Sequence, residues 1–160
     1  MKEECCPKFN PKLWDNKNHN WKSKPFIIDS MPTFFHIPFT PMIGIKMSKL
    51  WNLAKESKKI SPNKDKILIL FHDPSSFKSE ILVSVTGNVK EANNIKLTGN
   101  FFSKVYSGEY NEVPKFIKMM SEYLSNQGKN AKDFYIHYAY CPKCAKKYGN
   151  NYMIFFAKIK

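Results

Sequence analysis

Arginine is absent from this sequence of 160 residues, and all 26 basic residues are lysines. The arginine guanidinium binds phosphate and guanine through two parallel hydrogen bonds, whereas lysine supplies only a point charge. The lysines are also scattered along the chain instead of forming one block. The net charge of +13 therefore argues only weakly for nucleic-acid binding, and we do not expect nucleic acid to be the partner.

Long apolar runs and glycine-rich loops are also missing. No stretch approaches the ~18 apolar residues of a membrane-spanning helix, and the first residues lack a secretory signal. We therefore expect no membrane association and a cytoplasmic location. None of the six glycines belongs to a G-x-G-x-x-G phosphate loop, and no G-x-S-x-G motif occurs. These absences argue against a nucleotide-binding loop and a serine-hydrolase elbow.

The sequence does have an ample supply of core residues, with 42% hydrophobic and 15% aromatic. The first half of the domain is expected to begin with a strand at 34–39. An apolar stripe at helical spacing predicts a helix over about 43–58, which Pro62 would stop. Apolar strands follow at 66–71 and 80–86. The segment between these two strands begins at His72, and its Asp-Pro-Ser-Ser composition favours a turn.

The second half repeats this order of strand, helix and two strands. A strand is predicted at 101–106, followed by a helix that is capped near Asn111 and ends at Gly128. Strands at 133–140 and 151–159 complete the repeat. Such a half cannot cover its own apolar surface, so two halves are expected to pack together and leave a groove for a ligand.

The predicted fold class is therefore α+β, a duplicated βαββ arrangement with an antiparallel sheet and two helices on one face. The single domain is expected over 33–160, with halves at about 33–86 and 100–160. Residues 1–32 are predicted to form an N-terminal arm that packs on the domain through its aromatic side chains, with a short strand at 26–28.

Four cysteines form the sharpest local signal: Cys5 and Cys6 near the start, and Cys141 and Cys144 near the end. The two-residue gap between Cys141 and Cys144 allows both sulfurs to bind one tetrahedral metal ion. If the arm reaches this pair, the four cysteines form a structural zinc site, although adjacent cysteines are awkward ligands for one ion. A redox pair, an arm-to-loop disulfide and reduced thiols are the alternatives. The Cys-x-x-Cys segment is predicted to lie between strands, not at a helix start, which disfavours thioredoxin-type chemistry.

The stretch from Tyr106 to Pro114, YSGEYNEVP, leads into the second predicted helix. Its pattern of aromatic–x–Gly–x–Tyr–x–x–x–Pro resembles the GyrI-like (gyrase-inhibitory-protein-like) small-molecule-binding superfamily. The likeness extends over about 33–160 and includes the hairpin that leads to Glu80. The chain is also similar to small proteins with Cys-Cys-Pro and Cys-Pro-x-Cys motifs that are uncharacterised or labelled hydrolases. The cysteine insertion and the arm depart from the GyrI-like pattern.

This resemblance implies a groove for flat, often cationic, aromatic molecules, with Glu80 at the position of the family's carboxylate. It also implies that some relatives add water to electrophilic rings, which makes Glu80 the candidate catalytic residue. Tyr106, Tyr138 and Tyr140 combine a flat apolar face with a hydroxyl and are the predicted aromatic walls. His72 is the histidine best placed for acid–base work.

The predicted function is the binding of a small flat hydrophobic or cationic compound between the two halves, followed by its sequestration or hydrolysis. Whether the protein is an enzyme stays open at this point, as does the choice between monomer and dimer. One alternative is a basic interaction module that is held together by a structural zinc ion and binds nucleic acid or acidic protein. The other is a cysteine-based redox switch.

Overall fold

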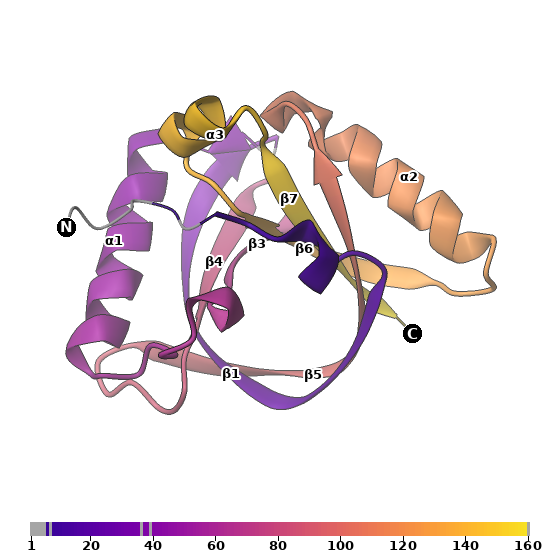
Figure 1. The fold of residues 1–160 in the computed structure, drawn as a ribbon. Coiled ribbons are helices and arrows are strands. Elements are labelled where there is room, and N and C mark those ends of the chain that lie inside the picture. The colour runs from indigo at the N-terminus through magenta and orange to yellow at the C-terminus, as the bar shows by residue number, and fades with distance from the viewer. Residues whose placement is uncertain (1–5, 7, 36, 39, 160) are drawn as a thin grey trace. The chain divides into compact units, whose positions relative to one another are not determined.

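The computed structural model describes residues 6, 8–35, 37–38 and 40–159 (Figure 1). The chain divides into two compact units, which we name for their place in the sequence. The middle unit is Lys22–Thr98, and the terminal unit combines the residues up to Trp21 with Gly99–Lys160. The structure confirms the α+β class with antiparallel strand pairing, and its described residues form three α-helices instead of the predicted two.

The middle unit holds an antiparallel sheet in the order β2-β1-β4-β3. Its elements are β1 (Lys17–Phe34), which begins in the terminal unit, β2 (Ile37–Pro38), α1 (Thr40–Glu56), a 3-10 turn (Lys64–Lys66), β3 (Ile69–Ser75) and β4 (Lys78–Ser84). Helix α1 packs on one face of this sheet, as Figure 1 shows. Leu50 and Ala54 of α1 contact Ile27, Ile81 and Val83, and all five side chains are buried.

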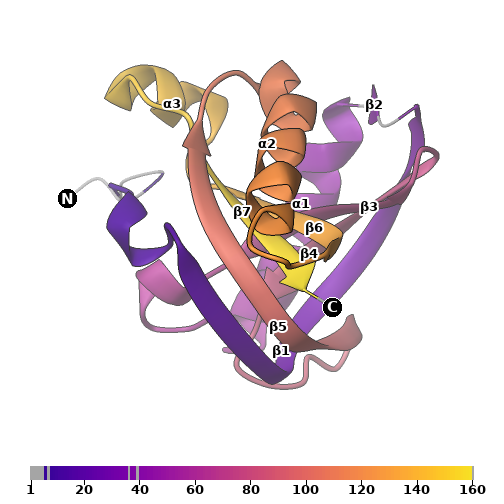
Figure 2. The ribbon, with the colours of Figure 1, turned by 90° about the vertical axis from the view of Figure 1, so that its right-hand side faces the viewer.

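The terminal unit holds an antiparallel sheet in the order β6-β7-β5. Its elements are a 3-10 turn (Pro11–Leu13), β5 (Asn93–Ser107), which begins in the middle unit, a 3-10 turn (Tyr110–Glu112), α2 (Val113–Ser125), β6 (Ala131–Tyr138), α3 (Pro142–Tyr148) and β7 (Tyr152–Ile159). Helix α2 lies on one face of this sheet (Figure 2). Phe116, Met120 and Leu124 recur at helical spacing and are buried against Phe155 of β7.

Local sequence explains where α2 begins and ends. The Glu112 carboxylate accepts a hydrogen bond from the Glu109 N–H at 2.7 Å and completes the capping box of the 3-10 turn Tyr110–Glu112, which leads directly into α2. Pro114 occupies the first turn, where its missing N–H costs nothing. Gly128 follows the helix with φ of 73°, a left-handed conformation that glycine adopts without a steric penalty.

Three predictions about the first part of the chain need correction. The arm expected over 1–32 is largely replaced by the 18-residue strand β1, so the expected boundary at residue 33 falls inside a strand. The short strand predicted at 26–28 is confirmed as part of β1, but the pattern of apolar residues did not reveal that the ladder with β4 continues to residue 32. Of the strand expected at 34–39, the described residues that form strands are only Phe34, which ends β1, and the two residues of β2. The turn expected from His72 begins later, because β3 continues to Ser75.

Each unit pairs its first long strand with its last strand, although the middle unit also contains β2 and the terminal unit also contains α3. In the middle unit β1 pairs with β4, and in the terminal unit β5 pairs with β7. The internal duplication itself stays a prediction. In the described part of the chain, no helix has both the length and the apolar character needed to cross a bilayer.

Candidate functional site

Glu80 lies near the start of β4, on the sheet face opposite α1. Its neighbour Ile81 is buried against α1, and successive side chains on a strand point to opposite faces. Glu80 is directly opposite Ser30 of β1 and His72 of β3, so both neighbouring strands fix its backbone. The carboxylate predicted from the sequence is therefore held by the regular part of the sheet.

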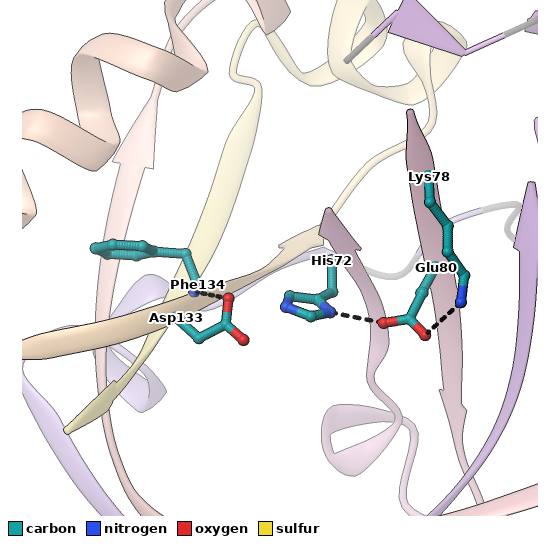
Figure 3. Close-up of polar contacts among 5 residues, drawn as sticks. All are labelled: His72, Lys78, Glu80, Asp133 and Phe134. Carbon is teal, nitrogen blue, oxygen red and sulfur yellow. Dashed lines mark hydrogen bonds and ion pairs between the residues drawn. The ribbon is translucent and has the colours of Figure 1, made fainter. Parts of the chain in front are cut away.

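His72 and Glu80 form a hydrogen-bonded pair across β3 and β4 (Figure 3). The His72 Nδ1 to Glu80 Oε1 distance is 2.8 Å, and the Lys78 Nζ lies 3.9 Å from Glu80 Oε2. An ionised carboxylate can only accept hydrogen bonds, so Nδ1 carries the proton when Glu80 is charged. The side chains of His72 and Glu80 are only 10% and 19% exposed. The pair is thus a partly desolvated acid whose orientation a histidine fixes.

The surroundings of this pair on the same sheet face are mostly apolar. Leu82 follows Glu80 by two residues on β4, and Leu70 precedes His72 by two residues on β3. Phe26 of β1 is directly opposite Ser84 and belongs to this face as well. Phe26, Leu70 and Leu82 are all buried. A carboxylate next to such side chains is weakly hydrated, which strengthens its attraction for a cation.

The three tyrosines predicted as aromatic walls all lie in the terminal unit. Tyr106 and Tyr138 pack on the α2 side of its sheet. The Tyr106 ring stacks on Phe116, with centroids 4.9 Å apart and planes at 15°. Burial raises the pKa of Tyr106, and Asp15 adds to this rise. Tyr140 lies beyond the end of β6, and its hydroxyl accepts a hydrogen bond from the Phe9 N–H at 2.8 Å. The sequence did not show that two of these tyrosines pack on the helix side.

The opposite face of the terminal sheet carries an aromatic cluster from the start of the chain. The Trp21 ring lies 4.4 Å from Phe101, and the Trp14 ring lies 5.7 Å from Phe156. Both tryptophan rings thus pack against phenylalanine rings of this sheet. His19 also lies in the cluster, with its ring centroid 5.6 Å from that of Phe156.

Ser103 pairs with His19 in this cluster, but the arrangement is not that of a nucleophile. The Oγ of Ser103 lies 2.8 Å from His19 Nε2 and donates to the Trp14 carbonyl at 2.5 Å. Ser103 is completely buried. A serine nucleophile must reach its substrate, so the geometry agrees with the absence of a serine-hydrolase motif.

Three of the four cysteines converge in the terminal unit. The Sγ atoms of Cys6, Cys141 and Cys144 lie within 4.8 Å of one another, and Cys5 lies outside the described residues. Burial raises the pKa of the Cys6 thiol to about 12; its two cysteine neighbours also raise the pKa, whereas the Cys141 N–H lowers it. This cluster is compatible with a metal site.

The segment that carries Cys141 and Cys144 differs from its predicted form. Cys141 is the N-cap of α3, and Cys144 lies in the first turn of this helix, so the Cys-x-x-Cys does begin a helix. Pro142 favours the helix start, and Gly149 ends it with φ of 74°. The flanking strands β6 and β7 are antiparallel neighbours, so the connection is not the parallel βαβ unit of thioredoxin-type proteins.

Comparison with protein families gives a match to a family described as bacterial hydrolase, over residues 1–159. The chain belongs to the bacterial hydrolase family. No curated protein matches the sequence.

Solved structures share the fold of this bacterial hydrolase family member. An uncharacterized conserved protein from Listeria innocua is 7% identical, with 91% of this chain and 92% of that chain covered and a TM-score of 0.66. The EcmrR C-terminal domain is 10% identical, with 92% and 98% covered and a TM-score of 0.63. SAV2435, solved with tetraphenylphosphonium bound, is 12% identical, with 91% and 94% covered and a TM-score of 0.57. At these identities the likeness shows the fold alone.

Proposed function

We propose that this protein is a GyrI-like binder of flat, hydrophobic, cationic small molecules, and that Glu80 is the polar anchor of its site. The observation that carries the proposal is a carboxylate held by His72 on a mostly apolar sheet face. SAV2435, which shares the fold, was solved with the organic cation tetraphenylphosphonium. Organic cations of this kind carry a single spread charge, which a weakly hydrated carboxylate attracts.

Electrostatics favour a cation at this position even though Lys78 is close. Two opposite unit charges about 5 Å apart attract each other by about 3 kcal/mol at an effective dielectric constant of about 20. The Lys78 Nζ lies 3.9 Å from Glu80 Oε2, and its side chain is half exposed, so solvent weakens its hold on the carboxylate. The carboxylate therefore attracts a ligand cation that displaces water from Glu80 more strongly than it attracts the solvated lysine.

The family description supports hydrolysis as the outcome of binding. In this proposal Glu80 accepts a proton from a water molecule as the water oxygen bonds to an electrophilic carbon of the ligand. The bond between that carbon and its leaving atom breaks, and the proton passes from Glu80 to the leaving atom. His72 is a positioning residue, because its hydrogen bond orients the carboxylate without contact with the reacting atoms.

The aromatic walls at Tyr106, Tyr138 and Tyr140 stay a prediction. Tyr106 and Tyr138 pack against the core under α2, and Tyr140 lies beside the cysteines. The proposal therefore depends on Glu80 and not on these rings.

Calorimetric titration with tetraphenylphosphonium tests the anchor. The Glu80→Gln substitution keeps the shape of the side chain and removes its charge, so we expect affinity to fall about tenfold, or about 1.4 kcal/mol. Glu56→Gln is the matched control: it removes the same charge from the exposed end of α1 in the same unit, and we expect unchanged affinity. Equal affinities in the Glu80→Gln variant and the wild type would refute the anchor.

A panel of strained-ring and ester electrophiles, followed by mass spectrometry in heavy-oxygen water, tests hydrolysis. We expect one heavy oxygen in the product of the wild type and no product above background with Glu80→Gln. Thermal unfolding of the two proteins should be similar, because Glu80 is replaced by an isosteric amide. Turnover that survives this substitution would remove Glu80 from the reaction while leaving the binding result intact.

A further inference from the structure

The cysteine cluster is independent of the Glu80 site and lies entirely in the terminal unit. Cys6 is separated by 135 residues from Cys141, yet the Sγ atoms of Cys6, Cys141 and Cys144 all lie within 4.8 Å of one another. It is the one group of three or more potential metal ligands found among the described residues. Cys144 is only 5% exposed, so at least one of the three sulfurs belongs to a buried side chain.

Contacts that do not involve the sulfurs help to hold this cluster together. The Tyr148 hydroxyl of α3 donates to the Cys6 carbonyl at 3.2 Å, and the Phe9 N–H donates to the Tyr140 hydroxyl at 2.8 Å. The rings of Tyr140 and Tyr148 are 4.8 Å apart, so the two anchors support each other. These contacts preorganise Cys6 beside α3, so little further ordering is needed for a ligand that joins the three sulfurs.

The distances suit a metal ion better than a single covalent bridge. With a zinc–sulfur distance of about 2.3 Å, sulfurs at two corners of a tetrahedron are about 3.8 Å apart. Sulfurs within 4.8 Å of one another therefore need to move by only about 1 Å for a zinc ion to bind all three. A disulfide would join two of them and leave the third thiol in the same enclosed space.

The chemistry of the cluster also indicates which kind of ion would bind. It contains sulfur and no carboxylate or histidine ligand, and soft sulfur ligands select zinc and similar ions over magnesium or calcium. The Cys141 N–H donates to Cys6 Sγ at 3.4 Å, which stabilises negative charge on that sulfur. Lys146 and Lys147 in the last turn of α3 add positive charge near a site that would carry three thiolates.

We propose that Cys6, Cys141 and Cys144 form a three-thiolate zinc site that fastens the start of the described chain to α3. Each thiol releases one proton to solvent as its sulfur replaces a water molecule on the ion, and no electron is transferred. The fourth position of the tetrahedron goes to water or to another side chain. Because Cys6 and α3 belong to distant parts of the sequence, the ion closes a long loop that begins and ends in the terminal unit.

Titration of the reduced, metal-free full chain with cobalt(II) under argon tests the site. We expect one equivalent to bind with strong sulfur-to-cobalt charge-transfer absorption and the visible bands of tetrahedral cobalt, and zinc to displace it. The Cys6→Ser substitution lies outside the regular elements and should preserve the fold, as circular dichroism can check. We expect it to weaken cobalt binding at least about tenfold, because a ligand is lost.

Lys143→Ala is the matched control, since Lys143 lies between the two cysteines of α3 and offers no sulfur. We expect this variant to bind cobalt as the wild type does. A second readout is cleavage by trypsin after Lys8 and Lys12, which are exposed. Zinc should slow this cleavage in the wild type and not in Cys6→Ser.

The absence of charge-transfer absorption in the reduced wild type would overturn the proposal, and so would wild-type binding by Cys6→Ser. A reduced protein that takes up no metal but loses two hydrogens on mild oxidation, with Cys141 linked to Cys144, would overturn it in favour of a redox pair.

Discussion

The buried hydroxyl of Ser103 holds separate segments of this fold together. It is completely buried and connects His19 with the Trp14 carbonyl, so it joins the start of the chain to β5. Among the serines it has the geometry most easily mistaken for a catalytic pair. Its burial indicates a structural role and not a catalytic one, and an experiment can distinguish the two roles.

We expect Ser103→Ala to lower the free energy of unfolding by about 1–3 kcal/mol, because it leaves the Trp14 carbonyl and His19 without this buried partner. Chemical denaturation followed by tryptophan fluorescence measures the loss. Any turnover found for the wild type should persist in the variant at a temperature where both are folded. Loss of turnover with unchanged stability would instead assign the hydroxyl to catalysis.

At the residue scale, the sequence predicted those site residues whose chemical type stands out from their neighbours along the chain. Glu80 and His72 stood out because an acid began an apolar strand and a histidine preceded Asp-Pro. Their pairing was hidden, because Asp73-Pro74 suggested a turn. The structure instead places an irregularity in the β3–β4 ladder between His72 and Ser75, which tolerates a proline that cannot donate a ladder hydrogen bond. The strand therefore continues far enough to place His72 opposite Glu80.

At the scale of single elements, the start of α2 depends on the small size of Gly108. A Cβ at this position would lie 2.8 Å from the Phe116 ring and would also collide with the Glu112 carboxylate of the capping box. We expect Gly108→Ala to destabilise the protein by about 1–3 kcal/mol, since the overpacked helix start must shift. Thermal or urea unfolding provides the measurement.

Gly44 is the matched control for this substitution. It lies inside α1, and a Cβ there would meet nothing within 4 Å. Alanine is favoured over glycine in helix interiors by about 0.5–1 kcal/mol, so Gly44→Ala should stabilise the protein. Two glycine-to-alanine changes with effects of the same sign would contradict this account.

Ion pairs attach α1 to β1, and their contribution to the stability of the fold should depend on pH. Lys46 and Lys49 of α1 lie 3.2 and 3.6 Å from the Asp29 carboxylate of β1. Burial alone raises the pKa of Asp29, but the Ser30 N–H and the two lysines outweigh burial, so the pKa is lowered overall. A carboxyl group with a lowered pKa in the folded state stabilises the fold only while it is ionised.

We therefore expect Asp29→Asn to lower the free energy of unfolding by about 1 kcal/mol at neutral pH. The difference from the wild type should be complete above the unfolded-state pKa of about 3.9 and should vanish as the pH falls through the lower folded-state pKa. Denaturant midpoints measured from pH 7 to pH 2 provide the check. Asp65→Asn, in an exposed 3-10 turn of the same unit, should show a much smaller effect. A deficit that grows toward low pH would contradict the assignment.

At the scale of the whole molecule, the periodicity of apolar residues predicted elements with one buried face. It missed strands whose pairing partners are distant in the sequence. Helix α2 was predicted closely, because Phe116, Met120 and Leu124 follow its period and Gly128 ends it. Strand β1 was mostly missed, because its ladder with β4 fixes it, and backbone pairing leaves no local signature. The cysteines behaved differently: ligand spacing singled out Cys141 and Cys144, and the approach of the arm was only a condition for a shared site, which the structure meets for Cys6.

The position of β7 has a consequence for biosynthesis. This strand lies between β6 and β5 in the terminal sheet, yet it is the last of all described elements to leave the ribosome. The middle unit can assemble during translation, whereas β5, α2 and β6 must wait with a gap in their sheet until Tyr152–Ile159 emerges. A nascent chain stalled before residue 152 should thus be captured by chaperones through its exposed Phe102 and Phe116 side chains, and release of the remaining residues should end that capture.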